Sequence, residues 1–369
     1  MAKRQLRYLF VGGFAARAGD GSLGGQVYAC RTLLASPLSQ WVGWTLIDST
    51  MASWPPPSFP RRLLKAVKRV LTFIRRLLSS RYDGALLFTA GGASFLEKGF
   101  LAFLASRRGL RVVLAPRSGH LAGDLERSRF LRWYLSFVFK HCDRVLCQGE
   151  SWKRYFLSLT GLPEDRFVVQ KNWIETGPYR DLGRRREKDG LTVLFLGQIE
   201  RLKGVHDLVE AVSLYRDRLA GVRFVLGGNG SALDEVRARL AKLGLTDRFE
   251  LPGWVDGDRK RELLDRAEIF VLPSHAEGMP NALLEAMAAG LAVVATRVGG
   301  IPDLVSSDEI GRLVPPRDPE ALGAVLAELA GRPDLRRRLG QAARRRIQSE
   351  HDVRLAWGRL YAVLAGDHV

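Results

Sequence analysis

IFVLPSHAEGMPNALLEAMAAG, residues 269–290, joins a short apolar run to a glycine-containing loop and then to a helical pattern. The apolar run, residues 269–272, predicts a buried strand, because turn-forming residues follow it at once. The helix is expected to begin near Pro280, since proline suits the first helical position, and to stop at Gly290. This stretch therefore predicts one strand-turn-helix unit of a parallel α/β sheet.

Similar units recur along the whole chain, which has 369 residues, enough for two domains of ordinary size. We expect an α/β protein with two Rossmann-like domains that face each other across a cleft: an N-terminal domain over residues 1–180 and a C-terminal domain over residues 181–355. Residues 356–369 are expected to form a helix that crosses back to the N-terminal domain. The polar stretch 184–190 is the expected linker. The predicted strands are residues 6–11, 84–89, 111–114, 143–147, 192–196, 223–226, 249–251, 269–272 and 292–295.

Membrane-spanning and disulfide-stabilised classes are excluded by simple features of the sequence. No apolar run approaches the roughly 18–20 residues that cross a bilayer. Basic residues before the apolar run 8–11 imitate a secretory signal, but the run is short and ends at two glycines, which favours a buried first strand. The three cysteines, Cys30, Cys142 and Cys147, have no metal-ligand spacing and fit reduced thiols of a cytoplasmic protein.

The net charge of +18 is unevenly distributed. Residues 1–180 hold 28 Lys and Arg against 11 Asp and Glu, whereas residues 181–369 hold 29 against 28. Such an excess of positive charge indicates that the first half of the chain faces an anionic partner, which could be nucleic acid, a lipid surface or a phosphorylated substrate. A basic, fully solvated surface is the alternative explanation.

Residues 61–78 carry a basic amphipathic pattern with apolar side chains at helical spacing. Such a helix can lie in an anionic lipid interface, where each Lys or Arg contributes about 1 kcal/mol. Alternatively, it packs its apolar stripe on a sheet, as ordinary domain helices do.

Two glutamates in the opening stretch have separate positions, Glu277 in the loop and Glu285 in the helix. Carboxylates accept hydrogen bonds from neighbouring hydroxyls, so one could bind a sugar and the other a ribose. Backbone N–H groups at the start of a helix favour an anion, which predicts a diphosphate site there. The residues expected to hold the diphosphate are Gly278, Met279, Pro280 and Asn281.

Further glycine turns follow the neighbouring strands, at residues 197–204, 227–230 and 299–302. The first contains Gly197, Arg201 and Lys203, and so supplies cations where phosphates would lie. Gly228 stands in the second turn. Each glycine alone could be a packing requirement, but together the turns predict a nucleotide-binding crevice.

In these motifs the sequence resembles the retaining glycosyltransferases of family 4, which have the GT-B fold. The resemblance implies that Lys203 binds the donor diphosphate, Glu277 the transferred sugar and Glu285 the nucleotide ribose. It departs from the family at Gln198, where an arginine is usual, so that either Arg201 supplies the missing cation or Lys203 acts alone. Trp254 and Val255 are expected to flank the nucleobase.

The N-terminal half resembles the family less closely. Gly24 and Gly25 match a glycine pair that lets donor and acceptor approach the backbone. Either Arg117 or His120 could occupy the place of a histidine beside the sugar, with a surface or helix-capping role as the alternative for His120. Asn172 matches an asparagine before the linker and has an expected structural role.

The resemblance implies a retaining, metal-independent hexosyltransferase without a cofactor. Its donor is a nucleotide-diphosphate sugar, with UDP favoured and GDP-mannose next, and its acceptor is a glycan or lipid-linked glycan in cell-surface polysaccharide synthesis. The leaving diphosphate would deprotonate the acceptor; Glu277 as a covalent nucleophile is the alternative. The spacing of Asp256 and Asp258 fits a metal-binding pair or, more simply, a polar turn.

The expected location is the cytoplasm, peripherally on the inner face of the membrane through an anionic lipid surface. No nucleic-acid partner is expected, because buried carboxylates oppose phosphates. Rival functions are a non-enzymatic protein that binds nucleic acid or another anionic polymer, a sugar-nucleotide epimerase of similar fold, and a glycan phosphorylase.

Overall fold

The computed structural model describes residues 4–15, 24–50, 57–183 and 190–366, apart from the side chain of His120. The chain forms two compact units, unit 1 from Met1–Trp173 and Val353–Val369 and unit 2 from Ile174–Asp352. The chain therefore passes from unit 1 to unit 2 after Trp173 and returns to unit 1 after Asp352. The boundaries expected from the sequence lie a few residues later, after residues 180 and 355. Most of the expected linker, residues 184–189, lies outside the described residues.

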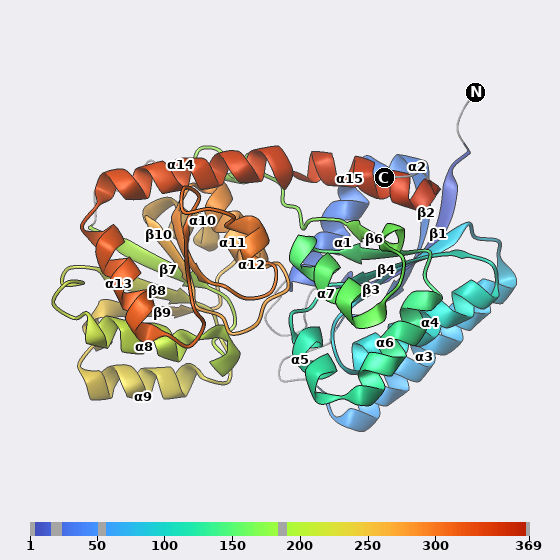
Figure 1. Cartoon of the computed structure of the whole chain (residues 1–369), viewed down its shortest axis with the longest axis horizontal. Coiled ribbons are helices and arrows are strands. Elements are labelled where there is room, and N and C mark those ends of the chain that lie inside the picture. Colours follow the sequence, from blue (N-terminus) through green and yellow to red (C-terminus); the bar gives the residue numbers. More distant parts are fainter. Residues whose placement is uncertain (1–3, 16–23, 51–56, 184–189, 367–369) are drawn as a thin grey trace. The chain divides into compact units, whose positions relative to one another are not determined.

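Unit 1 contains a six-stranded parallel sheet with helices on both faces (Figure 1). The strand order is β2-β1-β3-β4-β5-β6. Its elements are β1 (Leu6–Gly12), α1 (Gly25–Ala35), α2 (Leu38–Trp41), β2 (Val42–Asp48), α3 (Phe59–Ser79), β3 (Gly84–Thr89), α4 (Ala93–Arg107), β4 (Arg111–Pro116), α5 (His120–Arg127), α6 (Arg129–Lys140), β5 (Arg144–Cys147), α7 (Glu150–Thr160), β6 (Phe167–Val169) and α15 (Val353–Ala365).

Unit 2 repeats this architecture with the strand order β12-β11-β10-β7-β8-β9, again all parallel. Its elements are β7 (Thr192–Leu196), α8 (Val205–Leu214), β8 (Arg223–Gly227), α9 (Leu233–Leu243), β9 (Phe249–Gly253), α10 (Gly257–Arg266), β10 (Ile269–Leu272), α11 (Asn281–Ala288), β11 (Ala292–Thr296), α12 (Ile301–Leu304), β12 (Arg312–Val314), α13 (Pro319–Ala330) and α14 (Pro333–Glu350). The predicted α/β class with two Rossmann-like domains is therefore confirmed.

Alternate residues of β1 belong to different cores, as the pleat of a strand requires. Leu9 and Val11 pack in one core with side chains of α3, α4 and α6. Tyr8 and Phe10 pack in the other with side chains of α1 and α15. A strand buried on both faces reads as a continuous apolar run, which is why β1 is recognisable in the sequence.

Helix α15 completes the second of these cores, although it is far from the rest of unit 1 in sequence. Leu360, Val363 and Leu364 are buried in the same core as Tyr8. The hydroxyl of Tyr8 donates a hydrogen bond of 2.6 Å to the carbonyl oxygen of Leu364. Removing α15 would therefore uncover part of one face of the sheet in unit 1, the face that α1 also covers.

All nine predicted strands are present, with ends that differ by at most two residues. Three further strands, β2, β6 and β12, were not predicted, and each lies at an edge of its sheet. Helix α11 begins one residue after Pro280, near which its start is predicted. Pro280 is the N-cap of α11, and its ψ of 123° lies outside the helical range. Gly290 follows the helix with φ of 72°, as the predicted stop requires.

The basic amphipathic pattern of residues 61–78 lies in α3, which has 21 residues. Part of its apolar surface packs inward through Val70, Phe73 and Leu77. Another part, described below, is exposed. Among the described residues, no helix combines the length and hydropathy that a bilayer crossing requires. The three cysteines are buried thiols without a disulfide.

Candidate functional site

Five neighbouring strands of unit 2, β11, β10, β7, β8 and β9, end at one edge of the sheet and continue into turns and helices. Backbone hydrogen bonds join the turns to one another. The N–H of Ile199 donates to the carbonyl of Asn229 over 2.9 Å, and that of His275 donates to Leu202 over 2.8 Å. The carboxyl edge of a parallel sheet is where ligands of such folds bind.

Close contact between the turns explains why glycine is required in them. Gly204 has φ of 67°, and a Cβ atom there would overlap the carbonyl oxygen of Pro273. A Cβ atom at Gly228 would overlap the carbonyl oxygen of Gly197 in the same way. The packing explanation for these glycines is therefore correct, and it is also what brings the side chains of different turns together.

Glu277 lies buried between the turns after β7 and β10. Its Oε1 atom is 2.6 Å from the Nζ atom of Lys203, and the hydroxyl of Ser274 donates to the same oxygen over 2.8 Å. The structure thus brings together two residues that the sequence analysis assigned to the sugar and the diphosphate. Ser274 was not predicted as a contact, although it stands three residues before Glu277.

Glu285 is buried on α11 and forms a second pair of the same kind. Its Oε1 atom is 2.8 Å from the Nζ atom of Lys260, which lies in the first turn of α10. Sequence reasoning missed Lys260. The available signal was that α10 follows the turn at Trp254 and Val255, so its first residues begin at the same edge of the sheet.

Arg201 does not join Lys203 at Glu277. Its side chain is 77% exposed, and its guanidinium is 2.9 Å from the carboxylate of Glu235 on α9. Among the described residues, Glu277 thus pairs with Lys203, and Arg201 pairs with Glu235.

The remaining donor candidates of unit 2 lie along the same edge. Gly278 and Met279 are buried just before α11, and Asn281 is its first residue. Trp254 and Val255 follow β9, and Val255 is buried. The indole N–H of Trp254 is buried and has no hydrogen-bond partner among the described residues, so it is a donor that a ligand could satisfy.

Asp256 and Asp258 occupy the start of α10. Asp256 is the N-cap, and Asp258 forms an ion pair with Arg261 one turn further along the helix. This arrangement is that of a polar helix start.

In unit 1, Gly24 is the N-cap of α1, and Gly25 is the first residue of that helix. A Cβ atom at Gly24 would meet no described atom within 4 Å. Packing within the described residues therefore gives no reason for glycine at this position.

Arg117 follows β4 and is held by its own unit. Its guanidinium lies 4.9 Å from the ring of Phe88 and 5.1 Å from that of Trp173, and it donates to the Oδ1 atom of Asn172 over 2.6 Å. Burial lowers the pKa of Arg117 to about 10. Asn172 also accepts a hydrogen bond from Gln148, which gives it the structural role that was expected. The side chain of His120 lies outside the described residues.

Each unit is matched by a model of a known protein family. The Glycosyl transferases group 1 model matches residues 183–346, and the Glycosyl transferase 4-like domain model matches residues 35–173. The putative colanic acid biosynthesis glycosyltransferase WcaL of Salmonella typhimurium is 30% identical over 199 residues, which are 52% of this chain and 49% of that protein. The chain thus spans about half the length of the curated relatives it matches.

Two solved structures share the fold over nearly the whole chain. Sucrose-phosphate synthase from Thermosynechococcus elongatus has a TM-score of 0.79 at 19% identity, over 98% of this chain and 100% of that chain. HepE of Anabaena in complex with UDP-glucose has a TM-score of 0.72 at 18% identity, with the same coverage. With one family model in each unit and two sheets of this topology, the chain belongs to the group 1 glycosyltransferases of the family 4 type and has the GT-B fold.

Proposed function

We propose that this protein transfers a sugar from a nucleotide-diphosphate sugar to a glycan or a lipid-linked glycan. The observation that carries the proposal is the pair of buried glutamates, each with a lysine, in the turn after β10 and in the helix α11 that follows it. A carboxylate can bind sugar hydroxyls, and a lysine can neutralise phosphate, so the site offers both groups that such a donor needs.

In this proposal Lys203 and the start of α11 bind the diphosphate, Glu277 binds the transferred sugar and Glu285 the ribose. Lys203 contacts Glu277. An arriving diphosphate would share or take over that lysine and leave the Glu277 carboxylate to accept hydrogen bonds from the sugar. Lys260 would keep the Glu285 carboxylate oriented.

Retention at the sugar carbon follows if the acceptor attacks from the face that the diphosphate leaves. The bond from the sugar carbon to the phosphate oxygen breaks, a bond to the acceptor oxygen forms, and the acceptor proton passes to the departing diphosphate. The protein contributes electrostatic stabilisation and positioning through Lys203. No side chain then has to act as a conventional base.

We propose a UDP-sugar as the first choice of donor and GDP-mannose as the next, and the UDP-glucose complex of HepE supports the first choice. The description of WcaL supports a role in cell-surface polysaccharide synthesis. A lipid-linked acceptor on the cytoplasmic face of a membrane fits the basic helix α3, through which the protein would attach peripherally.

A donor panel tests the proposal. UDP-, GDP- and ADP-sugars are added in a thermal-shift assay, where a ligand at a hundred times its Kd stabilises by about 2.7 kcal/mol. The anomeric configuration of the product, measured by NMR with the best donor, then tests retention. Failure of every nucleotide sugar to stabilise the protein would overturn the proposal, and an inverted product would overturn the mechanism.

Metal independence is tested separately. We expect transfer to continue in excess chelator, and the Asp256→Asn/Asp258→Asn variant to be as active as wild type, because side chains and helix ends neutralise the diphosphate. A loss of activity in either experiment would instead support a metal held by these aspartates.

A further inference from the structure

Exposed apolar side chains concentrate on three helices of unit 1. Of the fifteen large apolar side chains exposed in the described part of the chain, ten lie on α3, α4 and α6. We call these ten residues the three-helix face. They are Phe59, Leu63, Leu64, Val67, Leu71, Leu78, Leu96, Phe100, Phe130 and Trp133.

Helix α3 contributes six of them, because only part of its apolar surface packs against the core. Leu64, Leu71 and Leu78 repeat every seven residues, and Leu64 is 70% exposed. Val70 and Leu77 are each one position earlier and pack against the core. The apolar sector of α3 is therefore wider than its packing surface, and unit 1 covers only part of it.

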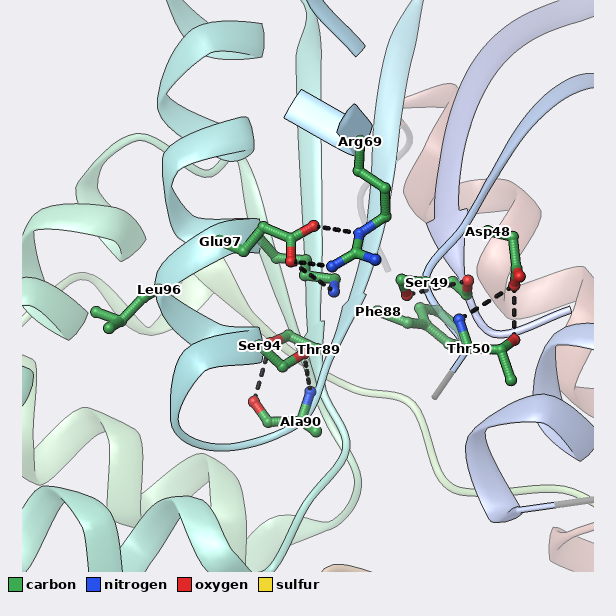
Figure 2. Close-up of polar contacts among 12 residues, drawn as sticks. Asp48, Ser49, Thr50, Arg69, Phe88, Thr89, Ala90, Ser94, Leu96 and Glu97 are labelled. Carbon is green, nitrogen blue, oxygen red and sulfur yellow. Dashed lines mark hydrogen bonds and ion pairs between the residues drawn. The ribbon is translucent and has the colours of Figure 1, made fainter. Parts of the chain in front are cut away.

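Helix α4 connects α3 to α6. Arg69 of α3 donates two hydrogen bonds, of 2.7 and 2.5 Å, to the carboxylate of Glu97 on α4. The hydroxyl of Tyr134 on α6 donates to the carbonyl oxygen of Leu96 over 2.8 Å. Figure 2 shows Glu97 directed toward Arg69 and Leu96 directed away from that pair. Helix α4 thus packs against both α3 and α6 (Figure 1).

Helix α6 adds aromatic side chains, which the sequence analysis did not single out. Phe130 is 59% exposed and Trp133 is 62% exposed. The two rings lie 5.9 Å apart, and Trp133 stacks on Phe137 at the same centroid distance. The rings are therefore ordered by their neighbours while remaining open to the outside.

We propose that the three-helix face rests in the interface of an anionic lipid bilayer, with α6 inserting Phe130 and Trp133 beside α3. The positive charge of α3 and α6 favours anionic lipid as the partner of this face. Together α3 and α6 contain ten Lys and Arg and no Asp or Glu, which complements anionic headgroups. The same ten charges oppose pairing with a second copy. Five of the ten apolar side chains are leucines, which bury in lipid but offer no ring for a nucleic-acid base to stack on.

This geometry gives attachment two separable components. Attraction of the basic side chains decays within a Debye length and weakens with salt. Burial of apolar side chains persists at high salt, and each large side chain that leaves water strengthens binding about tenfold. If the protein attached only through the basic charges of α3, vesicle binding would be lost in high salt. If it attaches through the whole three-helix face, high salt should weaken vesicle binding but not abolish it.

Vesicle binding distinguishes the two cases. The full-length protein is sedimented with vesicles of about 30% phosphatidylserine in phosphatidylcholine, at salt concentrations below and above physiological. Phe130→Ser/Trp133→Ser is compared with the apolar control Phe130→Leu/Trp133→Phe and with Leu214→Ser, which removes an exposed leucine from unit 2. We expect the serine pair to lower high-salt binding about 100-fold, and both controls to bind as wild type does.

Vesicles with brominated acyl chains supply a second readout. They should quench tryptophan fluorescence in wild type, and less in Trp133→Phe, which still binds. The inference fails if the serine pair binds vesicles like wild type at high salt. It also fails if this substitution abolishes self-association in the absence of lipid, which would make the face an interface between copies, or if RNA competes with lipid for it.

The inference rests on one part of the proposed function, which is that the protein works at a membrane. Nucleotide-sugar binding and transfer to a lipid-free acceptor measure the enzyme without the membrane. Vesicle binding without any transfer would therefore contradict the proposed function alone, and transfer without vesicle binding would contradict the three-helix face alone.

Discussion

Glu277 and Glu285 are both buried, and each contacts one lysine, but their other surroundings differ. Glu277 also accepts a hydrogen bond from Ser274 within the loop, whereas Glu285 lies in the middle of α11. A carboxylate that already has two donors is well oriented for a sugar that must be positioned for reaction. This difference separates the expected effects of their substitution.

We predict that Glu285→Gln and Lys260→Met each weaken nucleotide binding about 10- to 100-fold, since each disturbs a charge-assisted contact worth about 1.5–3 kcal/mol. Glu277→Gln should lower kcat more than nucleotide affinity, because its proposed partner is the sugar. Titration calorimetry gives the affinity and steady-state kinetics gives kcat. Glu309→Gln, an exposed substitution in the same unit, is the control. Equal losses of affinity in both glutamine variants would contradict the division of roles.

Lys98 on α4 is a buried cation outside the candidate donor site. Its side chain is 3% exposed, and its ammonium lies 3.7 Å from the carboxylate of Glu97, which Arg69 already binds. Burial lowers the pKa of Lys98 to about 8. Between that value and its ordinary pKa of 10.5, the folded protein binds fewer protons than the unfolded chain. Stability should therefore rise with pH across this window.

We predict that Lys98→Met is more stable than wild type at pH 7, by up to about 3 kcal/mol, because it removes a charge that is costly to bury. The advantage should shrink as the pH approaches about 10, where Lys98 is neutral in the folded protein. Urea unfolding at a series of pH values measures this. The exposed Lys242→Met provides the reference. A constant difference at all pH values would show that packing, and not charge, is responsible.

Contacts between residues that are far apart in sequence could not be predicted from the sequence alone. Glu277 and Glu285 could be found because they share one strand-turn-helix stretch. Lys260 could not be assigned to Glu285, because α10 and α11 meet only after the chain has passed through β10. Arg117 was expected near the cleft, but the sequence does not show that Phe88 and Trp173 hold its guanidinium.

At the scale of elements, burial explains which strands the sequence reveals. The interior strands are buried throughout or nearly so, as β3 and β11 are, and read as unbroken apolar runs. The missed strands β2 and β12 lie at sheet edges and are only partly buried, so polar residues interrupt their patterns. The missed β6 has only three residues. The exposed apolar sector of α3 likewise could not be inferred, because the spacing alone does not say which apolar side is covered.

Two glycines, one before α1 and one before α8, are predicted to respond differently to substitution by alanine. Gly24 has φ of −65° and room for a Cβ atom among the described residues, so Gly24→Ala should fold like wild type. If ligand approaches this backbone, the extra methyl group should lower kcat/KM about 10- to 100-fold. Gly204→Ala should instead destabilise unit 2, because the left-handed backbone and the carbonyl of Pro273 both oppose it. Thermal unfolding and kinetics of both variants test the contrast. Full activity in Gly24→Ala would remove Gly24 from the site.

Over the whole molecule, the net charge belongs to one unit. Unit 1 holds 29 Lys and Arg against 11 Asp and Glu, a net +18, and unit 2 holds 28 of each. Any long-range attraction to an anionic surface therefore comes from unit 1, whereas the proposed donor site in unit 2 contains the local pairs of Glu277 with Lys203 and Glu285 with Lys260.

We predict that raising NaCl from about 0.05 to about 0.5 M weakens vesicle binding at least about tenfold but changes nucleotide-sugar affinity less than about threefold. Sedimentation and calorimetry on the same protein provide the two curves. The Arg61→Gln/Arg62→Gln/Lys65→Gln/Lys68→Gln variant should flatten the first curve and leave the second unchanged. Equally steep curves would mean that the field of unit 1 also governs donor binding.

The contribution of α15 to unit 1 has a consequence for biosynthesis. The ribosome makes β1 first and α15 only after all of unit 2, yet Tyr8 and Leu364 share one core. Unit 2 is continuous in sequence and can close while translation proceeds, whereas the nascent unit 1 must wait with part of one sheet face uncovered. The larger segment of unit 1 is thus synthesised before unit 2 but is completed after it, and until then part of its apolar core is open to water.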